Sequence, residues 1–221
     1  MTYPKPSTNC INCDQNNSND CSDGAPAIHV INLSVCATVY VMDFVDLVRS
    51  QLALSKKSEL RVCMVCLGNI CRSPMAAAVL SNRAHEVSSP KIIVDSAGTG
   101  SWHIGEGPNF SSEATWKKAG YEYDHTAQQF TKDFYKSRDL ILVMDSANYQ
   151  NVLKLATNST EANKVFYLRQ FDPSLRHVDP RGSNAKSLEV PDPYGLAERA
   201  FEKVLEMVED SVEGLLEVLK S

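Results

Sequence analysis

The pattern of hydrophobic and polar positions changes near Leu60. From there on, short β-branched apolar runs alternate with segments in which apolar residues recur at helical spacing. This alternation is typical of a parallel sheet built from βαβ units. It predicts strands over residues 61–66, 91–95, 140–144 and 164–167. We therefore expect a three-layer α/β/α domain with a four-stranded parallel sheet over residues 59–221.

Helices are expected between these strands. Ser73-Pro74, residues 109–112 and Asp145 each offer side chains that favour a helix start. A final helix is predicted over residues 196–219 and should pack on the sheet, because its apolar residues form one stripe. The stripe consists of Ala197, Phe201, Val204, Leu205, Val208, Val212, Leu215 and Leu219.

Residues 1–58 have a different character and are predicted to be a mostly non-globular extension. Residues 1–26 are rich in Asn, Asp, Ser and Cys, a composition that favours disorder. Within the more apolar residues 27–55, helical spacing predicts a helix over residues 39–54. The apolar stretch of residues 27–42 is about 16 residues long, short of the roughly 20 that span a bilayer.

Four cysteines of this extension are candidate zinc ligands or a redox tail. Cys10 and Cys13 have the spacing of a metal-binding pair, and Cys21 and Cys36 follow. No second close pair of Cys or His completes such a site, so we favour a disordered extension, or an upstream region included by the gene model. The sequence thus predicts no metal and no cofactor.

Charge and cysteine usage narrow the possible partners and compartment. The net charge of −5 argues against nucleic acid or an anionic membrane surface as a partner. The seven cysteines are an odd number, and Cys63, Cys66 and Cys71 crowd one short segment, which favours a reducing compartment. The first residues lack the apolar core of a secretory signal, so we expect a cytoplasmic protein.

A candidate phosphate cradle lies between the first predicted strand and the next helix. The segment Val65-Cys66-Leu67-Gly68-Asn69-Ile70-Cys71-Arg72-Ser73-Pro74 runs straight into a helix with Pro74 at its expected first position. The N–H groups of a tight loop at a helix N-terminus bind phosphoryl groups. Gly68 and Asn69 suit such a loop because both tolerate positive φ.

Two side chains of this segment suggest its chemistry. Cys66 ends the strand facing the cradle, where the field that holds a phosphate also favours a thiolate nucleophile. Arg72 supplies a planar fork that binds two phosphoryl oxygens. Cys63, in the apolar strand itself, is interpreted as a small buried hydrophobe.

Residues 66–73 resemble the cysteine-x5-arginine signature of the low-molecular-weight protein tyrosine phosphatases. The similarity continues in the family's order through Asp95-Ser96-Ala97-Gly98-Thr99, Trp102, Gly120, His125-Thr126-Ala127, Met144-Asp145 and Asp192-Pro193-Tyr194-Gly195. It implies a flavodoxin-like phosphatase fold and hydrolysis of phosphotyrosine proteins and small aryl phosphates through a phosphocysteine on Cys66. It also implies inhibition by phosphate-like oxyanions.

The resemblance assigns further roles. Asp192, in a loop stiffened by two prolines, would protonate the leaving oxygen and then activate water, whereas Asp172 and Asp179 are interpreted as turn residues. A supporting network would join Asn69, Ser73, Ser96 and His125, with Ser73 also donating to the Cys66 thiolate. The substrate ring would lie between Trp102 and Tyr194. His85, His103 and His177 have no spacing that implies a metal and are expected to be solvated.

Four further positions bear on specificity and regulation. Ile70 matches tyrosine-directed members of the family, whereas relatives acting on phosphoarginine carry threonine there. Cys71 is either the partner of Cys66 in a reversible disulfide, which the family supports, or an inert loop residue. Gln128 stands where many relatives have arginine, and a single tyrosine, Tyr194, follows Asp192-Pro193 where animal members often have two.

Two other functions remain as alternatives. An arsenate reductase on the same fold would need relay cysteines downstream, and none follows Cys71. A phosphoprotein-binding module would lack the nucleophile or the acid, and both Cys66 and Asp192 are present.

Overall fold

The computed structural model describes residues 44–52 and 57–220. Its strands are β1 (Glu59–Cys66), β2 (Lys91–Gly98), β3 (Leu140–Val143) and β4 (Val165–Tyr167). Its α-helices are α1 (Phe44–Leu52), α2 (Arg72–Arg83), α3 (Phe110–Lys118), α4 (Phe134–Ser137), α5 (Ser146–Leu153), α6 (Ser159–Ala162) and α7 (Glu198–Leu219). Short 3₁₀ turns are η2 (Ala84–Glu86), η3 (Leu168–Gln170) and η4 (Ala185–Leu188).

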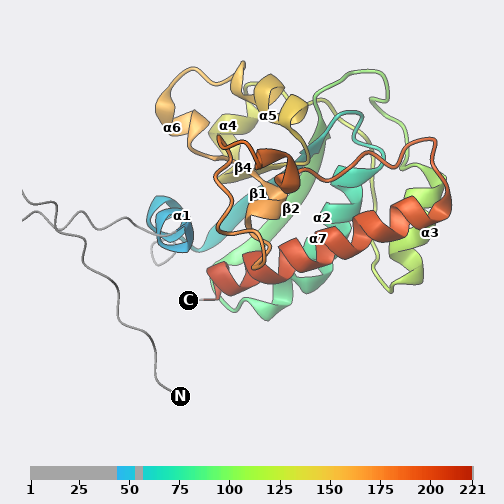
Figure 1. The fold of residues 1–221 in the computed structure, drawn as a ribbon, viewed down its shortest axis with the longest axis horizontal. Coiled ribbons are helices and arrows are strands. Elements are labelled where there is room, and N and C mark those ends of the chain that lie inside the picture. Colours follow the sequence, from blue (N-terminus) through green and yellow to red (C-terminus); the bar gives the residue numbers. More distant parts are fainter. Residues whose placement is uncertain (1–43, 53–56, 221) are drawn as a thin grey trace, which may run out of the picture. The chain divides into compact units, whose positions relative to one another are not determined.

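The four strands form one parallel sheet in the order β2-β1-β3-β4, which confirms the predicted fold (Figure 1). The chain moves from β1 to one side for β2 and then to the other side for β3. In such sheets, ligands bind beyond the carboxyl ends of the strands where the winding reverses. That place is the end of β1, at Cys66.

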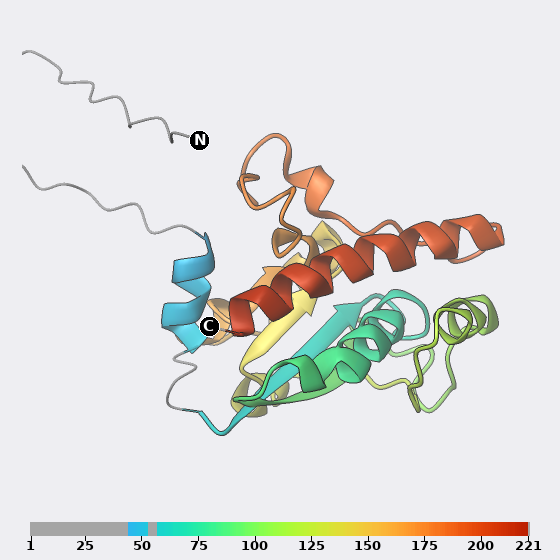
Figure 2. The ribbon, with the colours of Figure 1, turned by 90° about the horizontal axis from the view of Figure 1, so that it is seen from below.

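Alternate side chains of β1 supply two separate cores. Leu60, Val62 and Met64 belong to one apolar cluster, and Cys63 and Val65 belong to the other. The first cluster also contains the buried stripes of α2 and α7, and the second contains side chains of α4 and α5. The sheet therefore lies between two helical layers, with α2 and α7 side by side on one face (Figure 2). The expected burial of Cys63 is confirmed.

The helix starts differ in detail from the prediction. The helix α2 begins at Arg72, so Pro74 is its third residue and not its first. Proline is tolerated there because the first four N–H groups of a helix have no acceptor within the helix. The helices α3 and α5 begin as expected, with the side chains of Asn109 and Asp145 accepting from backbone N–H groups of their first turns.

The last helix begins at Glu198, two residues later than predicted. Ala197 has an extended backbone and is exposed, so it does not belong to the apolar stripe. The other seven predicted stripe residues are buried in the cluster that contains β1. This confirms that α7 packs on the core.

The predicted helix of the extension is present as α1. Residues 39–43 and 53–54 of its predicted range lie outside the described residues, as do the candidate zinc ligands Cys10, Cys13, Cys21 and Cys36. Val48 and Leu52 are buried in the first cluster. The ring of Phe44 lies 5.1 Å from that of Phe171. The helix α1 is therefore part of the core.

Within residues 44–52 and 57–220, no helix combines the length and hydropathy needed to cross a membrane.

Candidate active site

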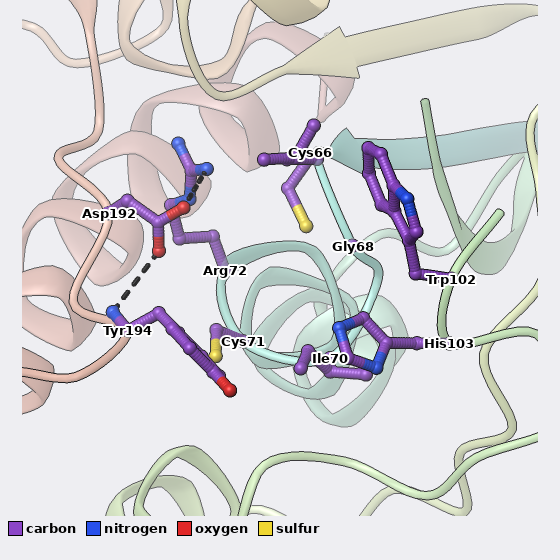
Figure 3. A pocket seen from close by; sticks show the side chains of 10 residues that line it. Cys66, Gly68, Ile70, Cys71, Arg72, Trp102, His103, Asp192 and Tyr194 are labelled. Carbon is purple, nitrogen blue, oxygen red and sulfur yellow. Dashed lines mark hydrogen bonds and ion pairs between the residues drawn. The ribbon is translucent and has the colours of Figure 1, made fainter. Parts of the chain in front are cut away.

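A cavity of about 210 Å³ opens at the carboxyl end of β1. The loop between β1 and α2 contributes Cys66, Leu67, Gly68, Ile70, Cys71 and Arg72 to its walls, and Trp102, His103, Asp192 and Tyr194 complete them (Figure 3). The three residues predicted for catalysis, Cys66, Arg72 and Asp192, thus share one cavity. Asp192 reaches it from a loop 120 positions away from Arg72.

The carbonyl groups of the loop face away from the cavity. Those of Cys66, Leu67, Asn69, Ile70 and Cys71 all accept hydrogen bonds from surrounding segments. The donors, in the same order, are Thr99 N (2.9 Å), Gly100 N (2.8 Å), His125 Nε2 (2.6 Å), Asn109 N (2.8 Å) and Ser112 Oγ (2.9 Å). Because the C=O and N–H of one peptide unit point in opposite directions, the loop N–H groups face inward and create an anion-binding concavity.

The tight path of the loop depends on Asn69 and Gly98. Asn69 has φ 56°, a left-handed conformation that asparagine tolerates better than most residues. Gly68, which suits the loop because glycine tolerates positive φ, does not adopt it. A Cβ there would instead lie 3.0 Å from Cδ2 of His103. At Gly98, a Cβ would lie 2.8 Å from the carbonyl oxygen of Leu67, so only glycine fits beneath the loop.

The side chain of Asn69 fixes the loop to its surroundings. Its Nδ2 donates to Ser73 Oγ at 2.9 Å and to Ser96 Oγ at 2.8 Å, and its Oδ1 accepts from Gln128 N at 2.9 Å. All three of Asn69, Ser73 and Ser96 are buried. The structure thus brings together the four residues of the predicted network, with His125 joined through the Asn69 carbonyl.

His125 donates to that carbonyl from Nε2. Burial lowers the pKa of the imidazole below its ordinary value, although the bond to Asn69 opposes the shift. A neutral ring with its proton on Nε2 satisfies both conditions. His125 is therefore hydrogen-bonded to the loop through the carbonyl oxygen of Asn69.

The sulfur of Cys66 accepts two hydrogen bonds. Asn69 N lies 3.2 Å from Sγ, and Ser73 Oγ lies 3.0 Å from it. Both donors belong to the loop or to the first turn of α2, where the helix dipole also favours negative charge. Two hydrogen-bond donors are thus directed at the Cys66 sulfur.

Arg72 is held by two carboxylates. Its Nη1 donates to Asp145 Oδ2 at 2.6 Å and to the Val190 carbonyl at 3.2 Å, and its Nη2 donates to Asp192 Oδ2 at 2.6 Å. Burial lowers the pKa of Arg72, but the charges of Cys66 and Asp192 and the bond to Asp145 outweigh it, so the pKa lies above its ordinary value. Nε is buried and has no hydrogen-bond partner among the described residues.

The loop that carries Asp192 is fixed next to β3. Val190 N donates to the Met144 carbonyl at 2.7 Å, and Asp192 Oδ1 accepts from Tyr194 N at 3.2 Å.

The family model described as "Low molecular weight phosphotyrosine protein phosphatase" matches residues 61–221. The chain belongs to this family.

Members of the low-molecular-weight phosphatase family resemble the chain in sequence and in fold. A low molecular weight protein-tyrosine-phosphatase of Streptomyces coelicolor is 41% identical over 161 residues, which are 72% of this chain and 93% of the relative. A protein tyrosine phosphatase of Entamoeba histolytica with Hepes in the active site has a TM-score of 0.63 and 33% identity, covering 73% of this chain and 97% of its own. The YwlE arginine phosphatase of Geobacillus stearothermophilus has a TM-score of 0.60 and 27% identity, covering 73% and 93% respectively.

Two exposed aromatic side chains flank the cavity of this family member. Figure 3 shows Trp102 and Tyr194 on opposite sides of the lining residues, with the sulfur of Cys66 between them. Trp102 is 69% exposed and Tyr194 is 61% exposed. Their faces are therefore available to an aromatic ring that enters the cavity.

His103 also lines the cavity, although the sequence predicted only a solvated histidine. Its Nδ1 lies 2.8 Å from Oε2 of Glu106, and Figure 3 shows the opposite edge of the ring directed into the cavity. Its position directly after Trp102 was the one sequence signal that could have indicated this placement. His85 and His177 are exposed, as expected.

The structure also bears on the predicted roles of Cys71, Asp172 and Asp179 and on possible metal ligands. Burial and the negative charges of Cys66 and Asp192 raise the pKa of Cys71 to about 12, so this thiol is protonated at neutral pH. Asp172 and Asp179 accept hydrogen bonds from backbone N–H groups two residues ahead, which confirms them as turn residues. Among the described residues, no three His, Cys, Asp or Glu side chains cluster in a way that would hold a metal ion.

Proposed function

We propose that this phosphatase-family chain hydrolyses phosphotyrosine and aryl phosphate monoesters through a phosphocysteine on Cys66. The observation that carries the proposal is that the Cys66 sulfur, the inward-facing loop amides and the Arg72 guanidinium share one cavity. A tetrahedral dianion needs several donors and one cation in a concave site. A nucleophile at the base of that site can attack phosphorus.

In the first step, the Cys66 thiolate attacks phosphorus while the bond from phosphorus to the ester oxygen breaks. Protonated Asp192 gives its proton to the leaving phenolate oxygen. Ser73 Oγ and Asn69 N, which lie 3.0 Å and 3.2 Å from the sulfur, stabilise its charge before attack. The S–P bond and a neutral phenol result.

In the second step, water attacks phosphorus and Asp192, now ionised, takes a proton from it. The S–P bond breaks, the thiolate of Cys66 returns and inorganic phosphate leaves. The same two hydrogen bonds to sulfur then favour Cys66 as the leaving group. No cofactor enters either step.

The guanidinium of Arg72 binds phosphoryl oxygens through Nε and Nη2, the edge that matches a pair of oxygens. Nε is free of partners among the described residues, whereas Nη2 is held by Asp192. Because Nη2 carries two N–H groups, it can donate to a phosphoryl oxygen beside Asp192. The carboxyl group takes up a proton from solvent before it acts as the acid. Asp145 keeps Nη1 in place meanwhile.

The substrate ring would lie between Trp102 and Tyr194. Ile70 supports an aryl ester over phosphoarginine, because an apolar side chain at the cavity wall offers nothing to a charged guanidinium. The arginine phosphatase among the similar structures has the same fold, so the preference must come from such wall residues. Phosphate-like oxyanions should inhibit, which agrees with Hepes, a sulfonate, in the Entamoeba relative.

The proposed assignment includes compartment, domain limits and regulation. The thiols of Cys63, Cys66 and Cys71 are free, which supports action in the cytoplasm. We assign the phosphatase domain to residues 59–221, with α1 packed against its apolar core. Oxidation of Cys66 and Cys71 to a disulfide, with peroxide as the oxidant, would reversibly protect the nucleophile.

The proposal is tested by p-nitrophenyl phosphate and phosphotyrosine turnover without added metal. Cys66→Ser should abolish turnover, and Arg72→Lys should lower kcat/KM strongly because lysine lacks the fork. Asp192→Ala should lower kcat more on phosphotyrosine than on p-nitrophenyl phosphate, because the better leaving group needs less protonation. Equal losses on both substrates would argue against Asp192 as the acid, and activity in Cys66→Ser would refute the phosphocysteine.

A further inference from the structure

Large exposed apolar side chains gather around the mouth of the cavity. The described residues include eight of them, and six either line the cavity, lie within two residues of a lining residue, or directly follow a residue that is hydrogen-bonded to the phosphate loop. These six are Leu67, Trp102, Ile104, Phe110, Tyr194 and Leu196. Single exposed apolar residues are common on proteins, but a group of them at one place marks an interaction surface.

Phe110 stands beside the phosphate loop. It is 82% exposed and is the first residue of α3. Its neighbours on that helix are tied to the loop: Asn109 N donates to the Ile70 carbonyl at 2.8 Å, and Ser112 Oγ donates to the Cys71 carbonyl at 2.9 Å. The backbone at Phe110 is therefore held beside the phosphate loop, while its ring is left largely uncovered.

Leu196 and Ile104 each lie within two residues of a side chain that lines the cavity. Leu196 is 61% exposed and lies two residues after Tyr194, in a turn closed by its N–H to the Pro193 carbonyl at 3.0 Å. Ile104 is 57% exposed and follows His103, which lines the cavity. Each side chain comes from a different wall segment.

The cavity is too small for more than the phosphorylated side chain. Its volume of about 210 Å³ lies below the roughly 300 to 1,000 Å³ of pockets that enclose larger ligands. Residues on either side of a phosphotyrosine must therefore lie on the rim. The chemistry of that rim then selects among protein substrates.

Resting on the proposed function, we propose that Ile104, Phe110 and Leu196 form a recognition surface for apolar side chains next to phosphotyrosine. The occupant is a phosphorylated segment of a protein substrate with a large apolar residue within a few positions of the phosphotyrosine. Its apolar neighbour covers the exposed ring of Phe110 or the side chain of Leu196 while the phosphoryl group occupies the loop. Buried aromatic and aliphatic anchors of this kind dominate binding energies at protein interfaces.

The test compares two phosphopeptides of equal length and charge, one with Leu and Phe flanking phosphotyrosine and one with Ser and Gly. We expect wild type to show a kcat/KM about tenfold higher for the apolar peptide, equivalent to about 1.4 kcal/mol. In Phe110→Ser and Leu196→Ser, this ratio should fall toward one. Leu155→Ser, which changes an exposed leucine that does not line the cavity, is the matched control and should keep the ratio.

The outcomes separate the inference from the proposed function. Turnover of both peptides at equal kcat/KM in wild type overturns the recognition surface alone. No turnover of either peptide or of p-nitrophenyl phosphate overturns the proposed function and the inference with it. If Phe110→Ser changes the sedimentation velocity of the protein and leaves the ratio intact, the rim binds a second copy of this chain, which also overturns the inference.

Discussion

Oδ2 of Asp192 lies 2.6 Å from Nη2 of Arg72, so the proposed acid and the proposed phosphate receptor are in direct contact. The arginine side chain is 3% exposed and the aspartate side chain is 42% exposed. The carboxylate thus places a negative charge beside the nitrogen to which a phosphoryl dianion would also bind. Any oxyanion that binds Arg72 through Nη2 shares the guanidinium charge with Asp192 and is repelled by its carboxylate, so the two anions compete electrostatically.

Removing this competition should tighten product binding. We predict that Asp192→Ala binds inorganic phosphate about fivefold more tightly than wild type at pH 7, since a partly exposed ion pair contributes about 1 kcal/mol. Isothermal titration calorimetry measures the difference. Asp179→Ala, which changes a turn aspartate outside the cavity, should bind phosphate like wild type. Weaker phosphate binding by Asp192→Ala would show that the carboxylate positions Arg72 and does not compete.

The hydroxyl of Ser73 should matter for catalysis far more than for folding. Its Oγ lies 3.0 Å from the Cys66 sulfur, and a hydrogen bond to a charged group contributes about 1.5–3 kcal/mol. We therefore expect Ser73→Ala to lower kcat about 10- to 100-fold. Ser81→Ala, on the same helix and bonded to backbone carbonyls, should keep kcat. A wild-type kcat in Ser73→Ala would remove this serine from the mechanism.

Burial of His125 predicts a pH-dependent component of stability. The pKa of this histidine is lowered from 6.5 in the folded protein, so the unfolded chain takes up its proton first as the pH falls. The free energy of unfolding is then lost as the pH falls from above 6.5 through the lower folded-state pKa. Between pH 7.5 and pH 5 (chosen to bracket about 6.5), the Tm of wild type should fall more than that of His125→Gln.

The control for this measurement is His177→Gln, which changes an exposed histidine. It should keep the wild-type pH dependence of Tm. If His125→Gln shows the same slope as wild type, then another group causes the loss of stability in acid.

The helix α1 should stabilise the domain although it lies outside residues 61–221, the range of the family match. Leu52 is 5% exposed and belongs to the main apolar cluster. We predict that Leu52→Ala lowers the free energy of unfolding by about 2–4 kcal/mol in urea titrations. Leu47→Ala, on an exposed part of the same helix, should change it by less than about 0.5 kcal/mol. Equal effects of the two variants would mean that α1 adds no core packing.

The sequence predicted those elements that depend on residues close to one another in the chain. All four strands, the cap residues Asn109 and Asp145 and the phosphate loop follow from periodicity and side-chain chemistry within a few positions of each other. Their ends were less accurate: Pro74 was placed too early in its helix, and α7 begins two residues late. Such boundaries depend on the conformation of single flanking residues.

What the sequence did not predict depends on contacts between distant segments. Asp145 was expected to cap a helix, but it also binds Arg72, 73 positions away, because β3 pairs with β1. His103 was expected in solvent and lines the cavity, since the loop after β2 folds back over Gly68. No local pattern encodes either placement.

One carboxylate thus serves both the scaffold and the anion receptor. Oδ1 of Asp145 accepts from Asn148 N at 2.7 Å and starts α5, while its Oδ2 holds Arg72 at 2.6 Å. Asp192 has no comparable duty in a helix. In a survey of every substitution scored separately for cellular abundance and for turnover, position 145 should lose both together, whereas position 192 should lose turnover and retain abundance.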